Sequence, residues 1–299
     1  MKNLIRTEQR NPNTLDIDEV STLDIVKKIN DEDKKVALAV EKALPEIAKT
    51  VDLISESFLN GGRLMYFGAG TSGRLGVLDA SECPPTFGVC SEMVQGFIAG
   101  GDSALRNAIE GAEDDFELGI QDVINSEANS CDVVIAISAS GNAKYLLGVL
   151  TKAREVGAKT ASVCCNKNAK MKELSDIFIC AEVGEEAITG STRMKSGTAQ
   201  KMILNMLSTS SMIKIGKTYE NLMIDLKPTN EKLVDRATRI VSELSESTYE
   251  NSKYKLIECD FNVKKAVLCL KLDISKELAE NILSKHSGKL KSALKDFLD

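Results

Sequence analysis

The sequence predicts an α/β protein: a doubly wound parallel sheet, with N-terminal helices and a small C-terminal helical domain. The middle of the chain alternates short apolar runs with segments of helical periodicity, and Asp132–Ile137 is the clearest run. Strands that alternate with helices indicate a parallel sheet covered on both faces. The predicted strands lie at residues 64–67, 93–99, 132–137, 160–165 and 177–181.

The segment before the sheet predicts an arm followed by helices. Residues 1–20 are polar and contain Asn11-Pro12-Asn13, which is typical of an extended arm. Apolar residues then recur at spacings of three and four from Val36 to Phe58, which marks one face of a helix. Pro45 should kink or split this helix, and Gly61-Gly62 should end it.

The segment after the sheet predicts a separate helical part. Residues 227–230 contain Pro228 and indicate a linker, and residues 231–299 show short helical patterns without Gly-rich loops. The predicted domains are therefore an arm with helices at 1–50, the sheet domain at 51–225 and a small helical domain at 226–299.

Composition argues against several classes of protein. The chain has 299 residues, a net charge of -6, 4% aromatic residues and no Trp, which disfavours nucleic-acid binding. No apolar run approaches the roughly 20 residues of a membrane span. The 8 cysteines form no C-x-x-C pair, which indicates reduced thiols rather than a zinc site. We therefore expect a cytoplasmic protein that binds neither nucleic acid nor membrane.

Three predicted strand-to-helix junctions are rich in glycine and hydroxyl groups, at residues 68–73, 138–142 and 189–198. Ligands of parallel sheets bind beyond the carboxyl ends of the strands, and a helix N-terminus with free N–H groups suits a phosphate. One such junction alone is more often a simple helix cap. Three in one sheet favour a phosphate site.

The first junction also matches the G-x-G-x-x-G pattern of dinucleotide-binding proteins. Those proteins place an acidic residue about 20 residues further on, whereas Asp102 follows the pattern by about 30 residues. This spacing disfavours a nucleotide ligand.

Longer motifs carry a more specific signal. The chain resembles the N-acetylmuramic acid 6-phosphate etherases in three longer segments, at residues 68–85, 188–201 and 205–209. Shorter matching segments lie at residues 7–14, 29–33 and 221–225. The resemblance implies a flavodoxin-like sugar isomerase (SIS) domain, a homodimer and no metal or organic cofactor. It implies a phosphorylated amino sugar as substrate, N-acetylmuramic acid 6-phosphate. Cleavage of its D-lactyl ether would give N-acetylglucosamine 6-phosphate and D-lactate, in the recycling of cell-wall sugars.

The resemblance places two glutamates at catalytic positions. Glu82 precedes Cys83-Pro84-Pro85 and is expected just beyond the first loop's helix, partly buried by its apolar neighbours. Glu113 lies in a run of acidic residues. An elimination needs a base at carbon 2, an acid for the departing lactate oxygen and a base for the incoming water, and carboxyl groups can serve as all three. The resemblance favours Glu82 for the lactate and the water, and Glu113 at carbon 2.

Substrate-binding candidates follow from the same motifs: Thr71, Ser72, Ser138, Ser140 and Ser191. Ala143 stands where SIS domains often have a Thr, so one hydroxyl contact is expected to be missing. Arg193 and Lys195 are equally consistent with a role against the phosphate charge and with solvated side chains. The only histidine, His286, is expected at a helix end.

Two other functions fit the three loops. A non-catalytic sugar-phosphate regulator would keep the loops without the carboxylates, and an aldose–ketose isomerase would need no acid for a leaving group. The presence of both Glu82 and Glu113 favours the etherase.

Overall fold

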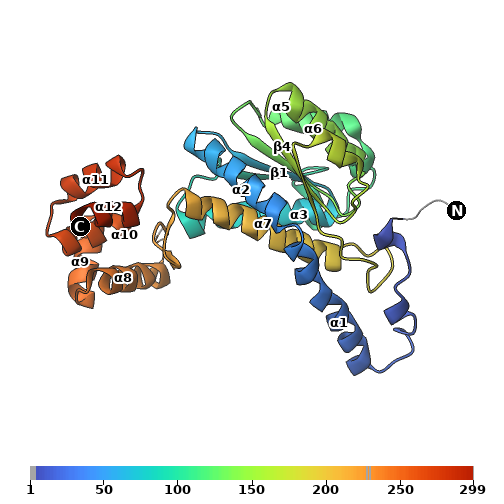
Figure 1. The fold of residues 1–299 in the computed structure, drawn as a ribbon, viewed down its shortest axis with the longest axis horizontal. Coiled ribbons are helices and arrows are strands. Elements are labelled where there is room, and N and C mark those ends of the chain that lie inside the picture. The colour runs from blue at the N-terminus through green and yellow to red at the C-terminus, as the bar shows by residue number, and fades with distance from the viewer. Residues whose placement is uncertain (1–4, 227, 229, 299) are drawn as a thin grey trace. The chain divides into compact units, whose positions relative to one another are not determined.

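The computed structural model describes residues 5–226, 228 and 230–298 (Figure 1). The chain forms two compact units, the first from residues 1–81 and 91–210 and the second from residues 82–90 and 211–299. Two residues of the predicted linker, Lys227 and Thr229, lie outside the described residues. The three-part division with boundaries after residues 50 and 225 stays a prediction.

The N-terminal part of the first unit is helical. Its elements are two 3-10 turns, η1 (Arg6–Glu8) and η2 (Pro12–Thr14), and two helices, α1 (Thr22–Glu41) and α2 (Leu44–Leu59). The predicted break at Pro45 is confirmed, since this proline occupies the first turn of α2. A proline is tolerated there because first-turn N–H groups have no partner within the helix.

Five parallel strands form the sheet of the first unit: β1 (Leu64–Gly68), β2 (Val94–Ile98), β3 (Val133–Ile137), β4 (Lys159–Cys164) and β5 (Ile177–Cys180). Their order is β2-β1-β3-β4-β5. Gly68 pairs with both Ile98 and Ile137, so three strands end at the same level. In this order the chain changes direction between β1 and β3, which is where doubly wound sheets bind ligands.

Helices cover both faces of this sheet, as predicted: α5 and α6 lie on one face, and α2, α3 and α7 on the other (Figure 1). The elements that follow the strands are α3 (Gly70–Phe87), α4 (Ser103–Arg106), η3 (Ala112–Asp114), α5 (Phe116–Asn125), α6 (Lys144–Glu155), η4 (Lys170–Leu174) and α7 (Lys195–Lys214). Met65 and Phe67 belong to the core under α6, whereas the Tyr66 hydroxyl donates to Asp79 on α3. Successive strand residues thus serve opposite faces.

Glycine allows α5 and α6 to pack closely. A Cβ at Gly119 would lie 2.0 Å from the carbonyl oxygen of Tyr145, and one at Gly148 would lie 2.1 Å from that of Phe116. The Tyr145 hydroxyl donates to Asp122 across the same contact, at 2.7 Å. This packing fixes the helical layer that carries the second loop.

The second unit is a small helical domain with a short hairpin. Its elements are β6 (Thr218–Tyr219), β7 (Leu222–Met223), α8 (Glu231–Ser245), α9 (Tyr249–Glu258), α10 (Val263–Leu272), α11 (Lys276–Lys285) and α12 (Leu290–Leu298). Ala237, Val241 and Leu256 belong to its buried core. The predicted short helices are confirmed. Throughout the described residues, no helix combines the length and the apolar character that crossing a membrane requires.

Candidate active site

A pocket of about 320 Å³ lies beyond the carboxyl ends of β1 and β2. The residues that line it include Gly70 of the first junction, Arg74 of α3, Ile109 and Glu113. Arg74 donates hydrogen bonds to the carbonyl oxygens of Ala104 and Leu105, at 2.7 and 2.9 Å. The guanidinium of Arg74 therefore fixes the backbone at Ala104 and Leu105 beside the pocket. The pocket brings together the first loop and one predicted catalytic glutamate.

Glu113 is one of three carboxyl residues that line this pocket, together with Glu110 and Asp114. It lies in the 3-10 turn η3 and is exposed to solvent. Partial desolvation by the surrounding protein raises the pKa of Glu113 above its usual value, and the nearby charge of Asp114 raises it further. A carboxylate with a raised pKa is a stronger base, so Glu113 suits the removal of a proton.

Glu82 lies within α3, not beyond it as the sequence predicted. The helix continues through Pro84 and Pro85 to Phe87, and the N–H of Gly88 closes its last turn on the carbonyl oxygen of Pro84 at 2.9 Å. Glu82 is exposed, contrary to the expected partial burial. The apolar neighbour Cys83 points inward instead, with 2% exposure.

The first loop places its hydroxyl groups at the start of α3. Gly70 has φ of 53°, a left-handed conformation that glycine adopts without strain. Thr71 is half-buried, and Ser72 is buried with its hydroxyl donating to Oε1 of Gln200 at 2.9 Å. No sequence pattern indicates this partner on α7.

The second loop holds two serines whose oxygens accept backbone N–H groups. Oγ of Ser138 accepts from Gly141 at 3.0 Å, and Oγ of Ser140 accepts from Asn142 at 3.3 Å. The two hydroxyl oxygens are 3.5 Å apart, so at least one hydroxyl proton can point toward a ligand. Ala143 occupies the N-cap of α6 without a side-chain cap, which fits the missing Thr hydroxyl.

The third loop differs from the predicted phosphate junction. The carboxylate of Glu186, 0% exposed, accepts hydrogen bonds from the N–H groups of Lys195 and Ser196 at 2.9 and 3.0 Å. It also accepts from the Ser196 hydroxyl at 2.8 Å. The start of α7 therefore already holds an anion. Ser191, half-buried, remains the candidate hydroxyl of this loop.

Lys195 cannot serve the phosphate, because its side chain is 1% exposed and its Nζ lies 2.6 Å from Oε2 of Glu32. Glu32, on α1, also accepts from Asn13 and Lys35. Arg193 is exposed. Of the two predicted basic residues, the structure leaves only Arg193 accessible.

The N-terminal arm packs along the third loop. The carbonyl oxygen of Thr7 accepts from Gly190 at 3.2 Å, and the Thr14 hydroxyl donates to the carbonyl oxygen of Ala187 at 2.8 Å. The Asn11 amide donates to the carbonyl oxygen of Glu185 at 3.1 Å. The arm thus fixes the backbone that precedes Ser191.

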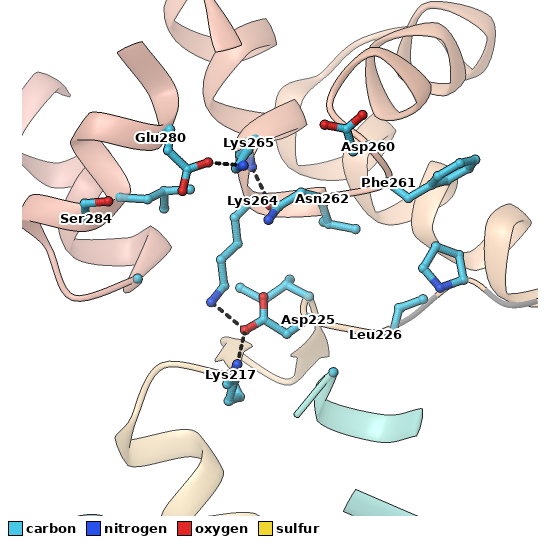
Figure 2. Close-up of a pocket in the computed structure, with 16 residues that line it drawn as sticks. Lys217, Asp225, Leu226, Asp260, Phe261, Asn262, Lys264, Lys265, Glu280 and Ser284 are labelled. Carbon is cyan, nitrogen blue, oxygen red and sulfur yellow. Dashed lines mark hydrogen bonds and ion pairs between the residues drawn. The ribbon is translucent and has the colours of Figure 1, made fainter. Parts of the chain in front are cut away.

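A second pocket, of about 430 Å³, lies in the helical unit (Figure 2). Asp225 binds Lys264 at 2.7 Å and Lys217 at 3.2 Å, and Lys265 pairs with Glu280. The two carboxylates are thus paired with three lysines, and none of the predicted site residues is among those that line the pocket. His286 lies at the C-terminal end of α11, the expected helix-end position.

Comparison with protein families agrees with the fold. Residues 46–154 match the glucokinase regulatory protein N-terminal SIS domain, and residues 119–210 match the SIS domain. A phosphoheptose isomerase from Francisella tularensis has the same fold, with a TM-score of 0.51 and 16% identity over 65% of this chain and 100% of that one. The sheet and its loops define an SIS-domain protein.

Curated relatives narrow this class. A relative from Clostridium botulinum (strain Langeland), named N-acetylmuramic acid 6-phosphate etherase, is 56% identical over 97% of this chain and 96% of its own length. Relatives with the same name from Glaesserella parasuis and Caldanaerobacter subterraneus are 55% and 54% identical, over 95% and 97% of this chain and 93% and 94% of their own lengths. The chain belongs to the N-acetylmuramic acid 6-phosphate etherase family, and the resemblance found in its motifs is confirmed.

Proposed function

We propose that the chain cleaves the D-lactyl ether of N-acetylmuramic acid 6-phosphate, giving N-acetylglucosamine 6-phosphate and D-lactate. This activity would serve the recycling of cell-wall sugars. Its relatives of 54–56% identity carry the name of this activity. The structural observation that supports it is the pocket that both Glu113 and the first glycine loop line.

The chemistry runs through the open-chain aldehyde of the sugar, whose carbonyl group acidifies the hydrogen on carbon 2. A base removes this proton, the carbon 2–carbon 3 double bond forms, and the bond from carbon 3 to the lactyl oxygen breaks. An acid protonates that oxygen, so lactate leaves as the alcohol. Water then adds at carbon 3 and a proton returns to carbon 2.

Glu113 is the proposed base at carbon 2. Its raised pKa and its place on the pocket wall support this role. Glu82 is the proposed acid for the lactyl oxygen and base for the water, on the strength of its family motif. Its exposure leaves its carboxyl group accessible to a substrate.

The proposed contacts to the 6-phosphate and the neighbouring sugar hydroxyls are Thr71, Ser72, Ser138, Ser140 and Ser191. The first two loops flank the point between β1 and β3 where the chain changes direction. The reaction as written needs no metal or organic cofactor. We also propose that the protein is cytoplasmic and works as a homodimer, as the family motifs imply.

The test is D-lactate release from N-acetylmuramic acid 6-phosphate by the purified protein. We expect lactate in proportion to enzyme, with oxygen from solvent at carbon 3 and deuterium from heavy water at carbon 2. Retention of the original carbon 3 oxygen would exclude elimination, and folded protein that frees no lactate would refute the activity. A regulator and an aldose–ketose isomerase both fail this assay.

The variant Glu82→Gln tests the proposed acid. It should stop turnover while N-acetylglucosamine 6-phosphate still binds with its original affinity, because the phosphate loops are untouched. Calorimetry and the lactate assay measure the two effects separately. Turnover at the wild-type rate would remove Glu82 from the mechanism.

A further inference from the structure

The side-chain amide of Gln200 lies behind the first loop. Gln200 is on α7 and is 1% exposed, and its Oε1 accepts the hydroxyl proton of Ser72. One turn earlier on the same helix, a Cβ at Gly197 would lie 3.5 Å from Cγ2 of Thr71. The first turns of α7 therefore support both hydroxyl residues of the loop that is proposed to hold the phosphate.

The amide nitrogen of Gln200 is buried without a partner. Within the part of the chain that the structure describes, its Nε2 makes no hydrogen bond. A buried N–H group without an acceptor is rarer in folded proteins than an under-used carbonyl oxygen. This orientation of the Gln200 side chain leaves the amide N–H group without an acceptor, which points to a second orientation of the amide.

The hydrogen bond also leaves Ser72 in the wrong direction for an anion. A serine hydroxyl has one proton and two lone pairs. While that proton goes to Gln200, Ser72 can offer a phosphate only lone pairs, which phosphate oxygens repel. A half-turn of the amide exchanges its oxygen and nitrogen. Nε2 then donates to Oγ of Ser72, and the hydroxyl proton becomes free.

We infer that Gln200 is a positioning residue that reverses its amide when a sugar phosphate binds, and so directs the hydroxyl proton of Ser72 to the phosphate. The reversal gives the buried N–H an acceptor and gives the phosphate a donor. After the reversal, the only group of the amide that lacks a hydrogen-bond partner is Oε1 of Gln200. This inference rests on the proposed function, because it assigns the phosphate to the first loop.

Two substitutions of Gln200, by Glu and by Met, distinguish a hydrogen-bonding role of this side chain from a role in packing alone. An ionised Glu at position 200 has two acceptor oxygens and no donor, so it keeps the Ser72 proton and adds a negative charge beside the loop. Met has a similar length and neither donates nor accepts strongly, so it leaves the Ser72 hydroxyl free to rotate.

The same pair of helices offers a matched control. Ser208 on α7 is 3% exposed, and its hydroxyl donates to Asp79 on α3 at 3.1 Å. Ser208→Ala removes a buried hydrogen bond between α3 and α7, two turns away from the loop. A loss of affinity that came only from looser helix packing would also appear in this variant.

The experiment measures kcat and KM for lactate release, together with calorimetric binding of N-acetylglucosamine 6-phosphate and of N-acetylglucosamine. We expect Gln200→Glu to raise KM and weaken binding of the phosphorylated sugar about 10- to 100-fold, with kcat nearly unchanged. Binding of the unphosphorylated sugar should stay within about twofold, and Ser208→Ala should change neither constant. Gln200→Met should give a smaller rise in KM.

A double-mutant cycle with Ser72→Ala completes the test. In the Ser72→Ala protein, Gln200→Met should change KM by less than about twofold, because the hydroxyl it would direct is gone. Full multiplication of the two effects would overturn the inference, as would wild-type KM in Gln200→Glu. If Gln200→Glu does not fold, the Met cycle decides. Absence of lactate from the wild type would refute the proposed function, whereas the binding data would still decide the role of Gln200.

Discussion

Replacing Glu32 with Gln should remove about 3 kcal/mol from the free energy of unfolding. Burial alone would raise the pKa of Glu32, but hydrogen bonds from Lys195, Lys35 and Asn13 lower it from 4.5 to about 2. At about 1.4 kcal/mol for each pH unit, this depression corresponds to about 3 kcal/mol. Loss of one partner of a buried ion pair costs a similar amount, about 3–5 kcal/mol.

Urea unfolding followed by circular dichroism at pH 7 measures this loss. The matched control is Asp31→Asn on the same helix, because Asp31 pairs with Lys34 at 2.7 Å and both side chains are 66% exposed. An exposed pair contributes less than about 1 kcal/mol, so the control should stay close to the wild type. Equal losses in the two variants would refute the reasoning.

The pH dependence gives a second check on the same residue. Because the pKa of Glu32 is lower in the folded state, its contribution is fully present above about pH 4.5 and disappears as the pH falls toward about 2. The difference in stability between the wild type and Glu32→Gln should therefore shrink over this window. A difference that stays constant down to pH 2.5 would contradict the assignment.

Two further predictions concern catalysis and packing. Glu113→Gln should lower kcat about 10²–10⁴-fold. In the wild type, the acidic limb of the pH profile of kcat/KM should lie above pH 4.5, because the pKa of Glu113 is raised. Asp114→Asn should move that limb to lower pH, because it removes a negative charge beside Glu113. A limb unaffected by Asp114→Asn would remove the charge effect. Gly119→Ala should cost about 1–3 kcal/mol in thermal unfolding, because its Cβ would lie 2.0 Å from a carbonyl oxygen of α6. Gly197→Ala, whose Cβ meets nothing closer than 3.5 Å, is the control, and equal effects would contradict this explanation.

The elements that carry local patterns could be predicted from the sequence. Apolar runs identified all five strands of the parallel sheet to within two residues at each end, and Pro45 marked the break between α1 and α2. The hairpin β6–β7 was missed because each strand has 2 residues, too few to show alternation. The continuation of α3 past Pro84 was missed because proline normally ends a helix.

The contacts that decide the site join distant parts of the chain. Ser72 and Gln200 are 128 positions apart, and Glu32 and Lys195 are 163 positions apart. From the sequence alone, a lysine near a glycine-rich loop is consistent with a solvated side chain or with a phosphate contact. Only the packing of α1 against the start of α7 shows that Lys195 is already neutralised. The family motifs contain all four residues without stating which of them meet.

The carboxylate of Glu186 at the start of α7 acts as a built-in substitute for a bound anion. A helix N-terminus whose N–H groups already bond a side chain of the protein has fewer donors to offer a phosphate. This leaves the starts of α3 and α6, on the two sides of the β1–β3 crossover, as the proposed site for the phosphate itself, with Ser191 beside the sugar. With one of the three helix starts occupied by the protein's own side chain, the proposed open-chain substrate has fewer orientations in which to bind.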